Sequence, residues 1–275
     1  MHIESIAQND YKEVPMNDNS KRNIPIELTN HPDYPKASGY DPAWVIENQM
    51  GPNVLWLAEA LGQVMDLKPG IRVLDMGCGT AMSSVFLAKE YGVQVWANDL
   101  WISATDNYRR IQAQCMADKV FPIHAEAHTL PYAGEFFDAI VSLDSYHYYG
   151  TDDYYLDTMV KLLKPGGQIG IISPGWVAEF GRAVPEHLAK VYHGGFDSWT
   201  TFHSPDWWRW HWEKTRLVDV DRAELLPAGF DLWLQWDEAL LKVLGKDSFF
   251  CQDIDVMRQD QGRNIGFTCM VARRR

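Results

Sequence analysis

The fold of this chain is decided by one stretch, Ile71-Arg72-Val73-Leu74-Asp75-Met76-Gly77-Cys78-Gly79-Thr80. Its apolar start predicts a buried strand, and its two glycines predict a sharp turn where a Cβ would collide with a ligand. A helix is expected over 83–91, and a second strand over 93–97. Two strands joined through a helix in this way form a right-handed crossover in a parallel sheet. The stretch therefore predicts a nucleotide-binding unit in which the helix N-terminus faces the ligand.

Asp99 lies at the end of the expected second strand, 22 residues after Gly77. An acidic side chain at that point can accept both hydroxyls of a ribose. The competing interpretation is a nicotinamide or flavin dinucleotide site, whose fingerprint has a third glycine three residues after the second. Met82 occupies that position, and Asp75 would place negative charge near a pyrophosphate. The pattern therefore favours a nucleoside that carries an amino-acid part with an ammonium group.

The rest of the chain alternates between helical and strand patterns. Further helices are expected over 52–66, 103–117, 154–163 and around 236–244. Further strands are expected over 120–123, 137–143, 168–173, 217–226 and 265–272. Run 137–143 is almost continuously apolar, as is typical of a strand buried on both faces. We therefore expect an α/β fold, with a doubly wound, Rossmann-like, seven-stranded sheet that is mostly parallel and has an antiparallel last strand.

Two segments fall outside this alternation. Residues 1–50 are rich in Pro, Asn and Asp, and we expect an N-terminal arm or lid without regular structure before Tyr40, followed by one domain over 51–275. A Trp-rich insertion at about 176–215 is expected to form a second lid. Seven of the twelve tryptophans lie between Ser198 and Trp236. Packing in the core is the plainer explanation, and an aromatic wall over a substrate pocket is the alternative.

Composition limits the classes of partner. The chain has 25 Lys and Arg against 37 Asp and Glu, a net charge of −12, which argues against nucleic acid as a partner. The four cysteines form no C-x-x-C pair, so neither a metal site nor a disulfide framework is expected. No apolar run approaches the ~18 residues that span a bilayer, so stable membrane insertion is not expected. We expect a cytoplasmic protein that acts on a small molecule, and a homodimer stays open.

Two motifs resemble those of a known family. The run from Val73 to Thr80 is similar to the first motif of class I S-adenosylmethionine-dependent methyltransferases, and the run from Leu162 to Gly167 resembles the turn before their fifth strand. The resemblance implies S-adenosyl-L-methionine as the cofactor. It also implies methyl transfer to a small-molecule N, O or S nucleophile by in-line displacement.

The same resemblance implies a set of cofactor-binding residues. Asp75 would hold the ammonium group, Gly77 and Gly79 would lie against the methionine part, and Asp99 would take the ribose hydroxyls. The adenine would be flanked by Leu100 and met by the segment around Glu126 and Ala127, which stand where the family has Asp-Ala. Asp144, at the end of the fourth strand, completes the set.

The chemistry is expected directly after that strand, where the methyl group should point. His147 is the candidate base, because a histidine titrates near neutral pH. Tyr146 and Tyr148 are expected to orient the acceptor. The alternative for His147 is a residue that contacts the cofactor or caps the strand without moving a proton.

Two other functions remain open from the sequence. The stretch from Tyr146 to Gly167 has a weaker similarity to the cyclopropane fatty acid synthase branch, but Tyr146 stands where that branch has a Glu. A lipid-modifying enzyme would need an apolar channel lined by the tryptophans. The second alternative is a non-catalytic cofactor-binding module.

Overall fold

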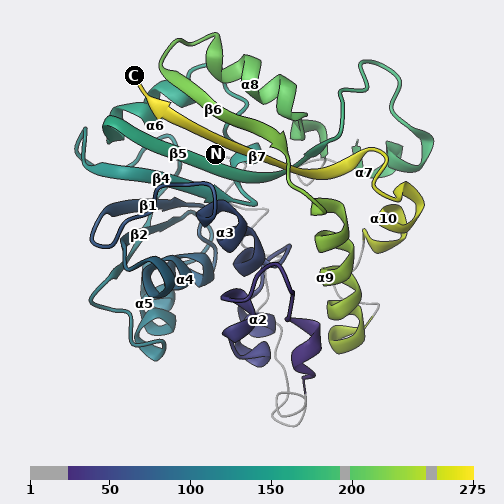
Figure 1. Cartoon of the computed structure of the whole chain (residues 1–275), viewed down its shortest axis with the longest axis horizontal. Helices are drawn as coiled ribbons and strands as arrows, with labels where there is room; N and C mark the ends of the chain where they lie inside the picture. The colour runs from purple at the N-terminus through teal and green to yellow at the C-terminus, as the bar shows by residue number, and fades with distance from the viewer. Residues whose placement is uncertain (1–23, 193–198, 246–252) are drawn as a thin grey trace.

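A computed structural model describes residues 24–192, 199–245 and 253–275. In this part of the chain one sheet organises the molecule (Figure 1). Its strands are β1 (Arg72–Met76), β2 (Gln94–Asp99), β3 (Val120–His124), β4 (Phe137–Leu143), β5 (Leu163–Trp176), β6 (Val218–Leu225) and β7 (Ile265–Arg274). The strand order is β3-β2-β1-β4-β5-β7-β6. Strands β1 to β5 are parallel, and β7 runs antiparallel to both β5 and β6. The predicted fold class is thus confirmed.

The helices lie on both faces of the sheet (Figure 1). They are α2 (Pro42–Asn48), α3 (Val54–Gly62), α4 (Met82–Tyr91), α5 (Ala104–Ala113), α6 (Tyr155–Leu162), α7 (Ala189–Tyr192), α8 (Pro205–Glu213), α9 (Gly229–Leu244) and α10 (Ile254–Asp260). Single 3₁₀ turns occur at Ile26–Leu28, Ala37–Gly39, Tyr146–Tyr148, Glu186–Leu188 and Trp199–Thr201. Among the described residues, no helix is long and apolar enough to cross a membrane.

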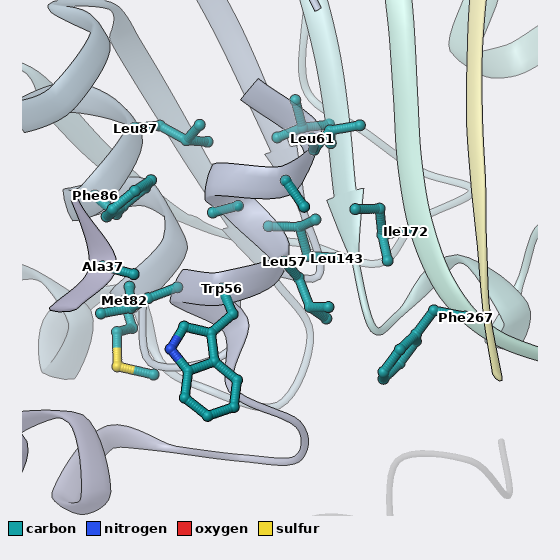
Figure 2. Close-up of a cluster of buried hydrophobic side chains, with 14 of the residues drawn as sticks. Ala37, Trp56, Leu57, Leu61, Met82, Phe86, Leu87, Leu143, Ile172 and Phe267 are labelled. Carbon is teal, nitrogen blue, oxygen red and sulfur yellow. The ribbon is translucent and has the colours of Figure 1, made fainter. Parts of the chain in front are cut away.

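Alternation along the strands builds two cores. In β1, Val73 packs into the core with α3, α4 and α9, whereas Leu74 packs into the core with α6 and α8. Successive side chains of a strand point to opposite faces, so one short strand serves both layers. Figure 2 shows the first core, where Trp56 and Leu61 of α3 lie among side chains from α4 and the central strands. Burial on both faces explains why the central strands are nearly all apolar.

The segment before α3 is more ordered than the sequence indicated. Tyr34 and Ala37 are buried, and the buried carboxylate of Glu59 in α3 accepts the backbone N–H of Ala37 at 2.8 Å. Helix α2 was not predicted, although Asp41 caps it and Pro42 begins it. Residues 24–50 therefore pack on α3 and α4 in the structure, whereas residues 1–23 of the expected arm lie outside the described residues.

Strand β5 differs from expectation, whereas the tryptophans follow the plainer of the two explanations. Strand β5 begins at Leu163, before the Lys-Pro-Gly-Gly turn rather than after it, because Leu163 pairs with Phe137 across an irregularity in β4. The tryptophans of 199–236 are largely core: Trp199, Trp208, Trp212, Trp233 and Trp236 are buried, and Trp210 is exposed. Trp208 and Trp212 point from α8 into the second core.

Candidate active site

One pocket lies at the carboxyl ends of β1, β2 and β4, where open α/β sheets bind their ligands. Its cavity volume is about 220 Å³. The wall combines the glycine turn, the ends of β2 and β4, and a loop after β3. A fifth part comes from the segment that leads into α3: Asn48, Met50, Gly51, Pro52 and Val54.

The glycine turn is packed tightly against neighbouring parts of the chain. Gly77 and Gly79 have φ of +69° and +54°, a conformation that L side chains rarely adopt. A Cβ on Gly77 would lie 2.3 Å from Ser145 Oγ, and one on Gly79 would lie 2.6 Å from Met50 Sδ. The backbone N–H groups of Gly77 and Cys78 donate to the carbonyl oxygen of Asn98 at 2.9 and 3.0 Å. The turn is thereby fixed against the end of β2.

Asp99 lines the pocket directly beside this turn. Its carboxylate accepts backbone N–H groups of Gly79 at 2.8 Å, Trp101 at 2.7 Å and Ile102 at 2.9 Å. Burial raises the pKa of this carboxyl, and the three N–H donors act in the opposite direction. Leu100 and Trp101 continue the wall from Asp99. The structure therefore brings Gly77, Gly79, Asp99 and Leu100 together as the sequence predicted.

Asp75 lies behind the glycine turn rather than in the pocket wall. Its Oδ2 accepts hydrogen bonds from the hydroxyls of Ser83 and Ser84, both at 2.6 Å. Its Oδ1 is buried without a hydrogen-bond partner among the described residues. Burial raises its pKa to about 6, although the two serines act to lower it. In this arrangement Asp75 ties β1 to the first turn of α4, and its predicted contact with an ammonium group stays a prediction.

The loop after β3 contributes Glu126, Ala127 and His128 to the wall. The Glu126 carboxylate accepts the backbone N–H of His128 at 2.8 Å and lies 2.6 Å from His128 Nδ1. Glu126 is therefore already engaged by its neighbour, but both predicted residues of this loop face the pocket.

The predicted catalytic residues separate in the structure. Tyr148 lines the pocket, and its ring makes an edge contact with Trp101 at 5.7 Å between centroids. Asp144, which was predicted to bind the cofactor, also lines the pocket. Tyr146 does not reach the wall, because it is fully buried against Trp208 and Trp212. The three residues Tyr146–Tyr148 form one 3₁₀ turn, so adjacent side chains point in different directions.

His147 also lies outside the pocket wall. It is buried, its Nδ1 lies 2.9 Å from the hydroxyl oxygen of Ser173, and its ring packs against Tyr148 at 4.0 Å. Burial lowers its pKa to about 3, so the imidazole is neutral over the physiological range. This placement fits a residue that supports Tyr148, and the role of base stays a prediction.

The sequence did not indicate the segment of residues 48–54. Thr80 of the glycine turn donates its hydroxyl to the carbonyl oxygen of Asn48, so the segment is bonded to the turn. Gly51 is hydrogen-bonded to α9, because Trp236 Nε1 donates to the Gly51 carbonyl oxygen at 2.8 Å. The one local signal is Asn53, which caps α3 through its side chain.

A glycine turn at the end of β1, an acid at the end of β2 and a wall completed by β4 define a nucleoside-binding α/β domain of the methyltransferase type. Comparison with known proteins agrees, since residues 73–167 match the methyltransferase domain family. The part of the chain from β1 to the start of β5 is thus similar to a methyltransferase domain.

Individual relatives match over part of their length. Methyltransferase GfsG of Streptomyces halstedii is 30% identical over 116 residues, which cover 42% of this chain and 42% of that protein. Phosphoethanolamine N-methyltransferase 1 of Zea mays is 33% identical over 135 residues, covering 48% of this chain and 26% of the maize protein. The chain therefore spans less than half the length of both relatives.

A solved structure extends the similarity of fold. Haemonchus contortus phosphoethanolamine N-methyltransferase 2, in complex with S-adenosyl-L-methionine, superposes with a TM-score of 0.69 and 19% identity over 92% of this chain and 60% of that one. The likeness therefore includes much of the segment before β1 and the elements after β5. The weaker similarity to the cyclopropane fatty acid synthase branch stays a prediction.

Proposed function

We propose that this chain binds S-adenosyl-L-methionine in the pocket and transfers its methyl group to a small-molecule N, O or S nucleophile. The observation that carries the proposal is the juxtaposition of the glycine turn and Asp99 with Asp144 and Tyr148 across one cavity. The matched methyltransferase family supports the reaction class.

The residues of the wall fit the cofactor. Gly77 and Gly79 both line the pocket, so the methionine part can lie on their backbone. Their missing Cβ atoms let Ser145 and Met50 pack closely beside the turn. Asp99 presents a carboxylate to the ribose, and Leu100 with Trp101 offers apolar surface to the adenine. Met82, buried at the start of α4, fills the place where a dinucleotide site needs glycine. The fit therefore favours S-adenosyl-L-methionine over NAD.

The bound cofactor supplies a methyl group on a sulfonium, which is an excellent leaving group. The protein then has to align the acceptor and exclude water. Tyr148 and Asp144 follow β4 and lie where the acceptor would approach. The lipid alternative is less well supported, because no tryptophan of 199–236 lines the pocket within the described residues.

Isothermal titration tests the cofactor. We expect micromolar binding of S-adenosyl-L-methionine and no binding of NAD. Asp99→Ala should weaken binding at least tenfold, whereas Asp118→Asn should not, because Asp118 is exposed just before β3, at the opposite edge of the sheet. Binding of NAD alone, or normal affinity in the Asp99 variant, would refute the placement.

Turnover is tested by formation of S-adenosylhomocysteine with panels of amines, phenols, thiols and lipids. Cofactor binding without turnover on any of them would favour the non-catalytic module instead.

A further inference from the structure

The pocket wall is rich in carboxyl groups. Its acidic side chains among the described residues are Asp99, Glu126 and Asp144, with His128 beside Glu126, and the described wall contains no Lys or Arg. Phosphate groups in proteins are usually held by Arg or Lys forks together with backbone N–H groups. The wall therefore offers no basic side chain to a phosphorylated acceptor. Phosphoethanolamine, the substrate in the names of the maize and Haemonchus relatives, is such an acceptor.

The three carboxyl groups of the wall differ in how many hydrogen-bond partners they have. Asp99 accepts three backbone N–H groups, and Glu126 is paired with His128. No hydrogen bond or ion pair to the Asp144 side chain occurs within the described residues. Burial alone raises the Asp144 pKa to about 8. Asp144 is thus the carboxyl of the wall with its hydrogen-bonding capacity still available.

The Asp144 side chain points at the segment before α3. A Cβ on Gly51 would lie 2.4 Å from Asp144 Oδ2, so this carboxyl meets the backbone of Gly51. Asp144 itself has φ of +54°, a rare conformation for a residue other than glycine. Its backbone N–H donates to the Ile172 carbonyl oxygen at 2.9 Å, which holds the residue at this angle.

A second carboxyl lies near the same segment. Asp237 of α9 follows Trp236, the residue bonded to Gly51. Asp237 is 5% exposed and, within the described part of the chain, has no hydrogen bond or ion pair. Burial raises its pKa to about 8, and the charges of Asp253, Asp144 and Glu238 add to this effect. A buried carboxyl without a partner is costly unless a ligand compensates it.

We propose that the acceptor is an amine that enters as an unphosphorylated ammonium group, bound by Asp144 and attracted by the nearby charge of Asp237. This inference rests on the proposed methyl transfer. In the described ranges no group of three or more His, Cys, Asp or Glu side chains could hold a metal ion.

The assignment also gives the reaction a route for its proton. An ammonium must lose a proton before its nitrogen can attack. Above about pH 8, where Asp144 is ionised, its carboxylate accepts that proton and passes it to solvent. The freed lone pair forms the N–C bond with the methyl carbon. The S–C bond breaks, and its electron pair stays on sulfur.

Binding of matched probes tests the charge of the acceptor without requiring turnover. The probes are choline, its neutral carbon analogue 3,3-dimethylbutan-1-ol, and phosphocholine, titrated into the full chain with and without S-adenosylhomocysteine. We expect choline to bind at least tenfold more tightly than either of the others. Equal binding of the neutral analogue, tighter binding of phosphocholine, or no binding of choline would overturn the proposal.

Variants assign the binding to the two carboxyls. Asp144→Asn should weaken choline at least tenfold and S-adenosyl-L-methionine by a clearly smaller factor, and Asp237→Asn should weaken choline less than Asp144→Asn does. Asp231→Asn is the matched control, because Asp231 is exposed on the same helix. Equal losses of choline and cofactor in the Asp144 variant would make Asp144 a cofactor residue and overturn the proposal.

Turnover separates this inference from the proposed function. Production of S-adenosylhomocysteine with alcohols or phosphorylated acceptors but not with amines would leave the methyltransferase standing and refute the amine acceptor. Absence of cofactor binding would refute the proposed function, and the choline titration without S-adenosylhomocysteine would still decide whether the site binds a cation.

Discussion

Replacement of Asp237 by Asn should stabilise the protein, and only at neutral to alkaline pH. The carboxyl is buried in α9, and the nearby charges of Asp253, Asp144 and Glu238 are all negative. Its ionisation is therefore opposed in the folded state and unopposed in the unfolded chain. Asn keeps the shape of the side chain and removes the charge.

The magnitude follows from the pKa. Raising the pKa of Asp237 from 3.8 to about 8 corresponds to about 6 kcal/mol of lost stability once the group is ionised in both states. A buried amide without partners costs about 1–3 kcal/mol, so we expect a net gain of about 3 kcal/mol in the variant. Below pH 4 the wild-type carboxyl is protonated in both states, and the gain disappears. Between pH 4 and pH 8 the wild type loses stability as the pH rises.

Urea unfolding at pH 5, 7 and 9 measures this difference. The stability of Asp237→Asn relative to wild type should grow across the series, whereas Asp231→Asn should give a small and constant difference. A difference that is the same at every pH would show that the charge of Asp237 is compensated in the folded protein, and the argument for a cation site near it would then fail.

Three further changes probe the pocket and the cores. Gly77→Ala should lower the free energy of unfolding by about 2 kcal/mol or more and impair cofactor binding, because the new Cβ would lie 2.5 Å from the Ser145 Cβ. Unchanged cofactor binding in calorimetry would argue against so close an approach of Ser145 to the turn. His147→Ala should lower the free energy of unfolding by roughly 2–3 kcal/mol, because a hydrogen bond to a buried hydroxyl is lost, and a lower melting temperature would report this. A variant of normal stability with abolished turnover would instead support His147 as the base. In urea unfolding, Trp208→Ala should lower the free energy of unfolding by about 3–5 kcal/mol, whereas Trp210→Ala should leave it nearly unchanged. Equal effects of the two changes would contradict the assignment of Trp208 to the core.

Much of the fold could be predicted because local patterns and tertiary structure agree. The run 137–143 is β4 to the residue, since a strand buried on both faces is apolar throughout. Helix α2 was missed because its seven residues are too few to show helical periodicity, although Asp41 and Pro42 are start signals. The irregular pairing of β4 that lets β5 begin at Leu163 depends on contacts between strands, which periodicity does not report.

The candidate site, like the fold, could be predicted where local patterns fix a residue's position and not where tertiary contacts do. Gly77, Gly79 and Asp99 could be placed from spacing, because the turn and the strand ends fix their positions. Which side chain of the turn at Tyr146–Tyr148 would face the pocket depends on the rotation of a single turn, set by the aromatic core behind it. Gly51 reaches the pocket through packing on α9, a contact between residues distant in sequence.

The bond from Trp236 to Gly51 joins residues 185 positions apart and has a consequence for assembly. The segment over the glycine turn gains this second anchor after α9 has docked, so the pocket is completed late, when most of the chain has been made. A ligand that binds in the finished pocket should favour the docked form of both parts together. Limited proteolysis would then show cuts near residue 50 and within α9 slowing in parallel as ligand is added.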